Sequence, residues 1–268
     1  MSSTVRMLPD ASPMVFEDSP LDEVVCQIRF NDILTIGEGP PAKLQDRLRR
    51  DFPIFGSEQG VQFGVSPMQS LSVLASPAPT WQFKSADEAW ITSVTTNFIA
   101  LKTTTYSDFP DFWSRLRSVL EAFENIYSPP FYTRVGLRYV NRIVIPRDGD
   151  QPVEWSSILN PRIAGEYSDP DLRGLVTESK HHAILEQPRG FVGWRYSRDV
   201  GEMDGNNAER FTLDFDHFVV GQLPLGDIPA LLADFNEALY RLFVWCLTPE
   251  GIKLLKPRPK AAARAEGR

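Results

Sequence analysis

Residues 134–145 read RVGLRYVNRIVI, and the pattern of this stretch decides the fold class. Apolar side chains recur at most alternate positions from Val135 to Ile145, whereas Arg138 and Arg142 stand on the opposite parity. Successive side chains of a strand point to opposite faces, so this period of two predicts a strand with one apolar and one polar face. Such strands are typical of antiparallel sheets that bury only one side.

The residues before this stretch predict strands and one long helix. The alternation over residues 24–30 predicts the first strand, and residues 81–106 predict a hairpin rich in Thr, Val, Ile and aromatic residues. Residues 108–126 predict an amphipathic helix, because apolar residues there follow a 3.6-residue period. Asp108 is a residue type that caps helices, and Pro110 suits the first turn.

The residues after this stretch predict a similar series, in which three strands precede a second amphipathic helix from about Pro229 to Leu247. Asp227 and Pro229 open this helix as Asp108 and Pro110 open the first, which suggests an internal duplication. We therefore predict an α+β fold with two pseudo-duplicated halves of antiparallel strands, each packed by a long amphipathic helix. The three strands are expected at residues 180–187, 191–198 and 209–220.

Segments punctuated by proline divide the chain. Residues 1–19 are polar and rich in proline, and residues 147–175 hold Pro152, Pro161 and Pro170, so neither segment is expected in the sheet. The predicted organisation is a flexible arm (residues 1–19), a first α+β half (20–146), a linker or insertion (147–175), a second α+β half (176–255) and a basic tail (256–268).

Composition restricts the class of protein. The 268 residues are 42% hydrophobic and 24% charged, which favours a folded core over disorder. The longest purely apolar run, residues 242–247, is too short for a membrane span, and the N-terminus lacks an apolar segment behind a basic start. We therefore expect a cytoplasmic protein with no membrane partner. Cys26 and Cys246 lack metal-ligand spacing and fit a reducing compartment.

The charge of the chain is acidic and uneven. Lys and Arg total 28 against 35 Asp and Glu, giving a net charge of −7, so we expect nucleic acid to be an unlikely partner. The basic tail holds five basic residues and one acidic residue, a composition typical of solvated chain ends.

The polar side of the predicted strands carries the candidate binding residues. Two arginines share one side of the strand at 134–145, two aspartates share one side of the strand at 209–220, and a third arginine ends the first strand. One interpretation is a sheet surface on which arginine forks hold a carboxylate or phosphate ligand. The other is cross-strand pairing of arginine with aspartate on an exposed face. The candidates are Arg29, Arg138, Arg142, Asp214 and Asp216.

Asp214 and Asp216 also permit a metal-assisted phosphoryl hydrolase. Alternate strand residues put both carboxylates on one side, and hard cations prefer oxygen ligands. Two carboxylates are too few, however, and His217 stands on the opposite parity, so we expect no metal site. His181 and His182 are neighbours that point to opposite faces of a strand, which disfavours zinc. The sequence contains no nucleophile elbow and no glycine-rich phosphate loop, so we predict no cofactor and assign no catalytic residue.

Two segments resemble a known family. Residues 19–30, which read SPLDEVVCQIRF, and residues 134–146, which read RVGLRYVNRIVIP, are similar to the hallmark motifs of a sporadically distributed bacterial family of uncharacterised proteins. The similarity extends to the strand at residues 213–216 and leaves out the arm and the tail. The resemblance implies no assigned activity, cofactor or catalytic residue. The patchy distribution of the family is compatible with mobile defence or toxin–antitoxin loci.

These observations favour a cytoplasmic binding or interaction module over an enzyme. The expected partner is a protein or a small anionic ligand, bound through the candidate residues on the sheet. Two alternatives stay open. One is the hydrolase built on Asp214 and Asp216, and the other is a structural protein that self-associates through sheet edges or aromatic helices, which leaves a homo-oligomer open.

Overall fold

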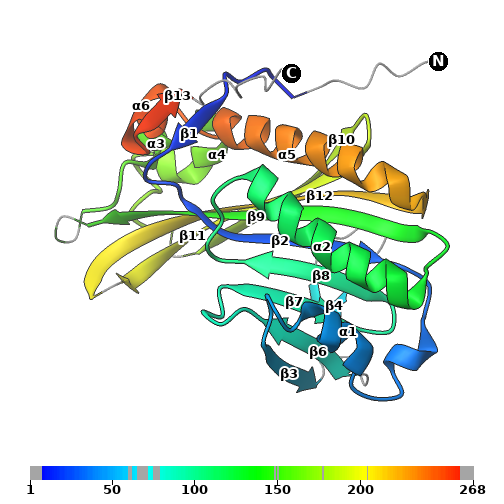
Figure 1. Ribbon diagram of the computed structural model, residues 1–268. Coiled ribbons are helices and arrows are strands. Elements are labelled where there is room, and N and C mark those ends of the chain that lie inside the picture. The colour runs from blue at the N-terminus through cyan, green and yellow to red at the C-terminus, as the bar shows by residue number, and fades with distance from the viewer. Residues whose placement is uncertain are drawn as a thin grey trace.

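The computed structural model describes residues 8–259 except 60–61, 65–71, 75–78, 148, 150, 177 and 204. Its main feature is a nine-stranded antiparallel sheet in the order β10-β11-β12-β9-β2-β8-β7-β6-β3 (Figure 1). The strands, in chain order, are β2 (Leu21–Arg29), β3 (Ile54–Gln59), β6 (Pro79–Lys84), β7 (Trp90–Val94), β8 (Phe98–Thr103), β9 (Tyr132–Pro146), β10 (Ser179–Gln187), β11 (Gly190–Met203) and β12 (Asn206–Leu223). The predicted α+β class with antiparallel strands is confirmed.

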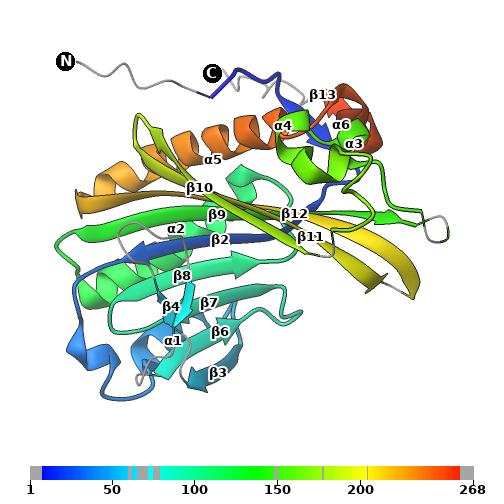
Figure 2. The same ribbon diagram turned by 180° about the vertical axis from the view of Figure 1, so that it is seen from behind.

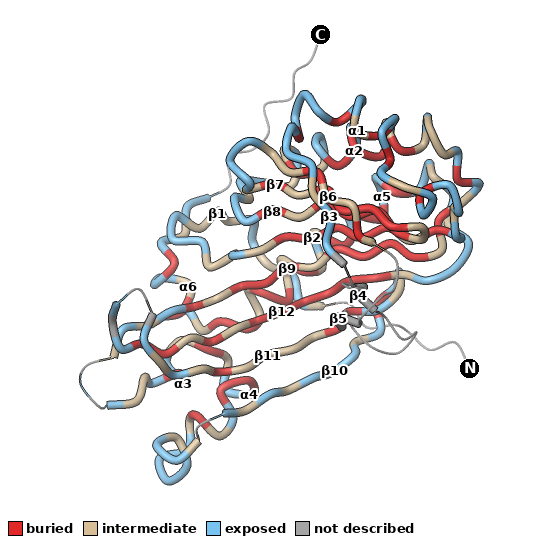
Figure 3. Tube along the Cα trace, turned by 90° about the horizontal axis from the view of Figure 1, so that it is seen from below, coloured by how far each residue is buried: buried red, intermediate tan, exposed pale blue. Residues whose placement is uncertain are grey.

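Strand β9 contains the stretch that decides the fold and lies near the middle of the sheet. It pairs with β12 on one side and with β2 on the other, antiparallel in both cases. Its odd-numbered apolar residues from Val135 to Ile143 are buried in the core, as the period of two predicts, and Val135 and Leu137 are fully buried. Figure 3 shows buried residues running along β9, β2 and β12.

Helices cover one face of the sheet. The longest are α2 (Phe109–Tyr127) and α5 (Ile228–Trp245), which lie in front of the sheet in Figure 1 and behind it in Figure 2. Asp108 caps α2 as predicted, because its Oδ1 accepts from the backbone N–H of Asp111 at 2.8 Å. Buried Phe112 and Phe235 belong to one hydrophobic core with the strand residues, and burying each such side chain stabilises the fold by about 1.5–3 kcal/mol.

Shorter elements complete the described chain. These are β1 (Met14–Phe16), the 3₁₀ turn η1 (Leu34–Ile36), α1 (Ala42–Leu48), β4 (Gln62–Gly64), β5 (Ser72–Leu74), α3 (Trp155–Ile158), α4 (Pro161–Ala164), η2 (Gly165–Ser168), η3 (Leu225–Asp227), α6 (Pro249–Leu254) and β13 (Pro257–Pro259). Strands β4 and β5 pair only with each other. Among the described residues, no helix has the length and apolar character that crossing a membrane requires.

The hairpin predicted over residues 81–106 is a three-stranded meander of β6, β7 and β8. A turn after β7 causes the difference. Thr95 and Phe98 pair through their backbones, with the N–H of Thr95 donating to the carbonyl of Phe98 at 2.9 Å. The Thr95 hydroxyl also accepts from the N–H of Asn97 at 3.3 Å, so short polar side chains make this turn without glycine or proline.

Two predicted segments differ from expectation, and a third takes one of its two predicted forms. The flexible arm and the basic tail contain β1 and β13, which pair antiparallel with Phe16 opposite Pro257. The segment at 147–175 is packed against the core, because Trp155, Ile163 and Tyr167 are each about 1% exposed. Within the described residues this segment is therefore an insertion that helps to close the core.

Candidate functional site

The face of the sheet that α2 and α5 do not cover, here called the second face, carries charged residues. The odd-numbered residues of β9 enter the core, so the even-numbered Arg134, Arg138 and Arg142 lie on the second face. Asp216 of β12 lies directly opposite Arg138, and Arg195 of β11 lies directly opposite Asp214. These registers bring charged side chains of three neighbouring strands together.

Two aspartates bind three of these arginines through ion pairs. Arg138 holds Asp214 with two parallel hydrogen bonds, Nε to Oδ1 at 2.8 Å and Nη2 to Oδ2 at 2.9 Å. Arg195 Nη2 lies 2.9 Å from Asp214 Oδ2, and Arg134 Nη2 donates to Asp216 Oδ2 at 2.9 Å. In each ion pair between β9 and β12, the arginine therefore binds an aspartate that does not lie directly opposite it in the strand pairing.

A fourth arginine joins this group from β2. Arg29 lies directly opposite Arg134, and burial together with the Arg134 charge lowers the pKa of Arg29. We call these six residues the arginine cluster. Its members are Arg29, Arg134, Arg138, Arg195, Asp214 and Asp216.

The arginine cluster is partly closed to solvent. Asp216 and the Arg134 side chain are 1% and 3% exposed, and the Arg134 guanidinium lies 4.9 Å above the ring centroid of Phe218. The side chains of Arg138 and Arg195 are 21% and 25% exposed. Burial alone would lower the pKa of Arg138, but the bond to Asp214 outweighs it and the pKa is raised. Asp214 therefore fixes both of these solvent-facing side chains in place and holds Arg138 in its charged form.

Several buried polar atoms of this region are left over. Among the described residues, Arg134 Nε, Asp216 Oδ1 and Gln27 Nε2 have no hydrogen-bond partner. The Oε1 atom of Gln27 accepts a hydrogen bond from Arg134 Nη1 at 3.4 Å. Because an unpaired buried polar group costs free energy, these atoms mark the interior of the cluster as a place of unused hydrogen-bonding capacity.

Glycine at position 136 makes room for the buried guanidinium. A Cβ at Gly136 would lie 2.5 Å from Nη1 and 2.9 Å from Cζ of Arg134. We expect Gly136→Ala to displace the guanidinium from Asp216 and to lower the free energy of unfolding by about 1–3 kcal/mol, measured by urea denaturation. Gly56→Ala on β3, where a Cβ meets nothing within 4 Å, is the matched control and should cost less. Equal effects of the two substitutions would contradict this role.

The structure brings together four of the five predicted candidates. Arg29, Arg138, Asp214 and Asp216 belong to the arginine cluster, but Arg142 does not. Arg142 forms an ion pair with Asp22 and lines a separate polar hollow of about 510 Å³, together with Glu202 and Arg210. Arg142 is therefore outside the arginine cluster, although it lies as many residues from the position opposite Asp214 as Arg138 does, because it pairs with Asp22 instead.

Sequence reasoning missed Arg134 and Arg195. Arg134 stands at the start of the stretch RVGLRYVNRIVI, an even number of residues before Arg138. The alternation of the strand therefore already predicts that both side chains lie on the same face. Arg195 faces Asp214 because the β11–β12 hairpin turns between residues 203 and 206. A register counted outward from that turn would have found this pair.

The expected pairing of arginine with aspartate is present, but the aspartates do not lie on an exposed face. Asp214 binds two arginines and Asp216 binds one, and both aspartates are buried. The described residues contain no group of three His, Cys, Asp or Glu side chains placed to hold a metal ion. Guanidinium groups at hydrogen-bonding distance also disfavour a second cation on the same carboxylates.

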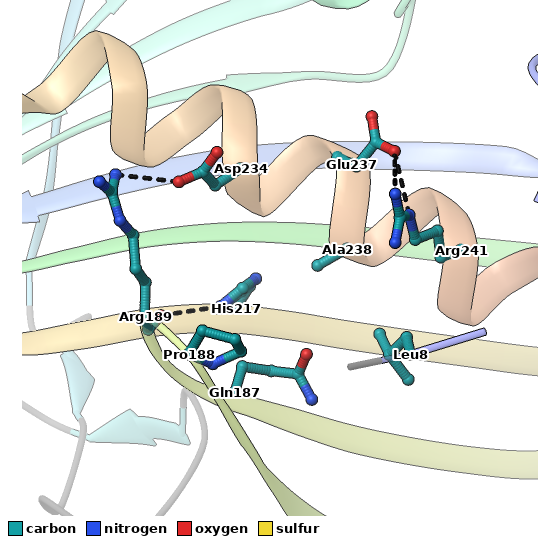
Figure 4. Close-up of a pocket in the computed structure, with 9 residues that line it drawn as sticks. All are labelled: Leu8, Gln187, Pro188, Arg189, His217, Asp234, Glu237, Ala238 and Arg241. Carbon is teal, nitrogen blue, oxygen red and sulfur yellow. Dashed lines mark hydrogen bonds and ion pairs between the residues drawn. The ribbon is translucent and has the colours of Figure 1, made fainter. Parts of the chain in front are cut away.

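A cavity of about 320 Å³ lies on the helix side, between α5 and the turn from Gln187 to Gly190 (Figure 4). His217 forms part of its wall, with Nε2 3.0 Å from the carbonyl of Arg189 and the ring stacked on Phe235. Burial lowers the pKa of His217 to about 4, so the imidazole is neutral near pH 7. At the rim, Arg189 pairs with Asp234 at 2.9 Å. This wall carries balanced charge, unlike the arginine cluster.

Comparison with known proteins adds no relative. The similarity of residues 19–30 and 134–146 to a sporadic bacterial family therefore stays a prediction. No protein-family model matches the chain, and no curated protein matches it.

Proposed function

We propose that this protein is a binding module whose arginine cluster holds an anionic group, a carboxylate or a phosphate, of its ligand or partner. The observation that supports this is the charge ratio of the cluster, in which four guanidinium groups surround two carboxylates within a chain of net charge −7. Arginine forks match the planar oxygens of carboxylates and phosphates, so a group of arginines of this kind favours an anion as ligand.

The position of the solvent-facing arginines supports the same proposal. Asp214 holds Arg138 and Arg195 on either side of one carboxylate, so both guanidinium groups are oriented before a ligand arrives. Preorganised donors lose little conformational entropy on binding. Partial burial also strengthens the attraction, because the effective dielectric constant falls away from bulk water.

The metal-assisted hydrolase is the weaker proposal. It needs Asp214 and Asp216 to coordinate a cation, but both carboxylates already accept hydrogen bonds from arginines. Titration with Mg²⁺ and with Mn²⁺ separates the two proposals. Saturable binding that Asp214→Asn abolishes would favour the hydrolase.

Binding of the anion is tested by calorimetric titration with inorganic phosphate and, separately, with acetate. Arg195→Ala is expected to weaken the binding of the preferred anion at least tenfold, since a hydrogen bond to a charged group contributes about 1.5–3 kcal/mol. Arg142→Ala, which removes an arginine of the same face outside the cluster, should leave affinity unchanged. Equal affinities of the two variants, or a wild-type protein that binds neither anion, would refute the proposal.

We further propose that the chain is internally duplicated. The strand order supports this, because β2-β8-β7-β6 on one side of the sheet has its counterpart in β9-β12-β11-β10 on the other. Helix α2 follows β8 as α5 follows β12. In this proposal the second half begins with β9, earlier than the boundary after residue 146 that the sequence predicts. Arg29 then comes from the first half and the rest of the cluster from the second, so the anion site forms where the halves join. A cytoplasmic role in a mobile defence or toxin–antitoxin locus rests on the family resemblance alone.

A further inference from the structure

Strand β10 is an edge of the nine-stranded sheet. It pairs with β11 without interruption from Ser179 opposite Arg198 to Gln187 opposite Gly190. In the part of the chain that the structure describes, no strand pairs with its outer side. β10 contains no proline and no bulge, two of the devices that protect an edge from pairing with another chain. Figure 3 shows this strand at the border of the sheet, with much of it exposed.

The side chains of β10 are arranged symmetrically about its centre. Ala183 is the middle residue of the strand, and Lys180 and Glu186 stand three positions before and after it. All three residues are exposed, and Ile184 presents an apolar side chain that is 39% exposed. Lys180 makes an ion pair only with nearby Glu178 among the described residues, and its side chain is 72% exposed.

We propose that β10 pairs antiparallel with β10 of a second copy of this chain, with Ala183 opposite the partner's Ala183. This register overlaps all nine residues of both strands. It places Lys180 opposite the partner's Glu186, and the two-fold axis repeats the same pair on the other side. Opposite charges that face each other across an antiparallel pair stabilise it, whereas like charges destabilise it. The two sheets then continue into one another.

Neighbouring registers do not offer this complementarity. Only every second residue of an edge strand turns its backbone N–H and C=O groups to the outer side. Two copies therefore form hydrogen bonds only when odd-numbered residues lie opposite odd-numbered residues, and the two-fold axis then passes through one residue position. Centring on His182 puts Glu186 against the partner's Glu178, which is a contact of like charges. Centring on Ile184 shortens the overlap and leaves Lys180 opposite the partner's Pro188, outside the strand. The register centred on Ala183 is therefore favoured by both length and charge.

Charge reversal tests this inference independently of the anion site. The full-length protein is expected to be a dimer when light scattering is measured during gel filtration over a range of protein concentrations. Lys180→Glu and Glu186→Lys should each weaken dimerisation at least tenfold, because each creates two contacts of like charge. The double variant restores opposite charges and should return to the wild-type dimer. Lys253→Glu, on exposed α6, is the control and should not change the dimer.

A cysteine placed at the centre reports the register. Directly opposite residues of antiparallel strands have Cα atoms about 4.5–5.5 Å apart, within the range that a disulfide spans. Ala183→Cys should therefore form a linked dimer under mild oxidation, and Ile184→Cys should link poorly. Cys26 and Cys246 are buried and should not compete. A monomeric wild-type protein, single variants that dimerise normally, or faster linkage at position 184 would each overturn the proposal.

Discussion

Replacing Glu209 with alanine is expected to lower the free energy of unfolding by about 3–5 kcal/mol, as the loss of one partner of a buried ion pair does. Glu209 is fully buried on β12. Its Oε2 accepts from Arg198 Nε at 2.7 Å and from Trp155 Nε1 at 2.8 Å, and its Oε1 accepts from the N–H of Val153 at 3.1 Å. The substitution leaves the Arg198 charge buried without its counter-ion. Urea denaturation of both proteins measures the difference.

The control is a glutamate in an exposed ion pair. Glu121 on α2 lies 3.5 Å from Arg117, and both side chains are largely exposed. Glu121→Ala should change the free energy of unfolding by less than about 1 kcal/mol. If Glu209→Ala proves as mild as Glu121→Ala, the Glu209 network does not hold the insertion at Trp155 against the sheet.

The same network predicts a dependence on acid. Burial alone would raise the pKa of Glu209, but its hydrogen bonds to Arg198 and Trp155 outweigh burial and lower it from its usual value of 4.5. A depressed carboxyl pKa stabilises the fold fully above the unfolded-state value and loses that contribution as pH falls through the folded-state value. Below about pH 4.5, wild-type stability should therefore fall more steeply than that of Glu209→Ala.

Local sequence patterns predicted the elements of this fold well. The alternation in residues 134–145 determines which side of β9 enters the core, because a strand turns every second side chain to the same face. Asp108 predicted the start of α2 for a local reason, since a capping carboxylate needs only the backbone N–H of the next turn. Features that depend on one strand or on one helix cap were within reach of the sequence, whereas the turn from Thr95 to Phe98, which contains no glycine or proline, was not.

Features that depend on pairing between distant segments were not. The sequence shows that Arg138 and Arg142 share a face, but only the folded structure shows that Arg138 pairs with Asp214 and Arg142 with Asp22 of the distant strand β2. Pairing of β1 with β13 joins opposite ends of the chain, and nothing local in either segment predicts it. The buried state of Arg134 likewise follows from the tertiary fold and not from its neighbours in sequence.

The second large effect is expected at Asp216. Asp216→Ala should lower the free energy of unfolding by about 3–5 kcal/mol, because it leaves the Arg134 guanidinium buried without its carboxylate. The loss is aggravated by Arg29, whose charge lies opposite Arg134 across β2 and β9. Urea denaturation at neutral pH measures this change.

Removing both charges should reverse most of the loss. A buried ion pair replaced by apolar groups of similar volume is often neutral or stabilising, so Arg134→Met with Asp216→Leu should recover most of the wild-type stability. The double variant keeps Arg138 and Arg195 on Asp214. A stable double variant that no longer binds phosphate or acetate would place Arg134 in the anion site, whereas one that binds normally would limit the site to the two solvent-facing arginines. A double variant as unstable as Asp216→Ala would show instead that this pair is required for the sheet itself.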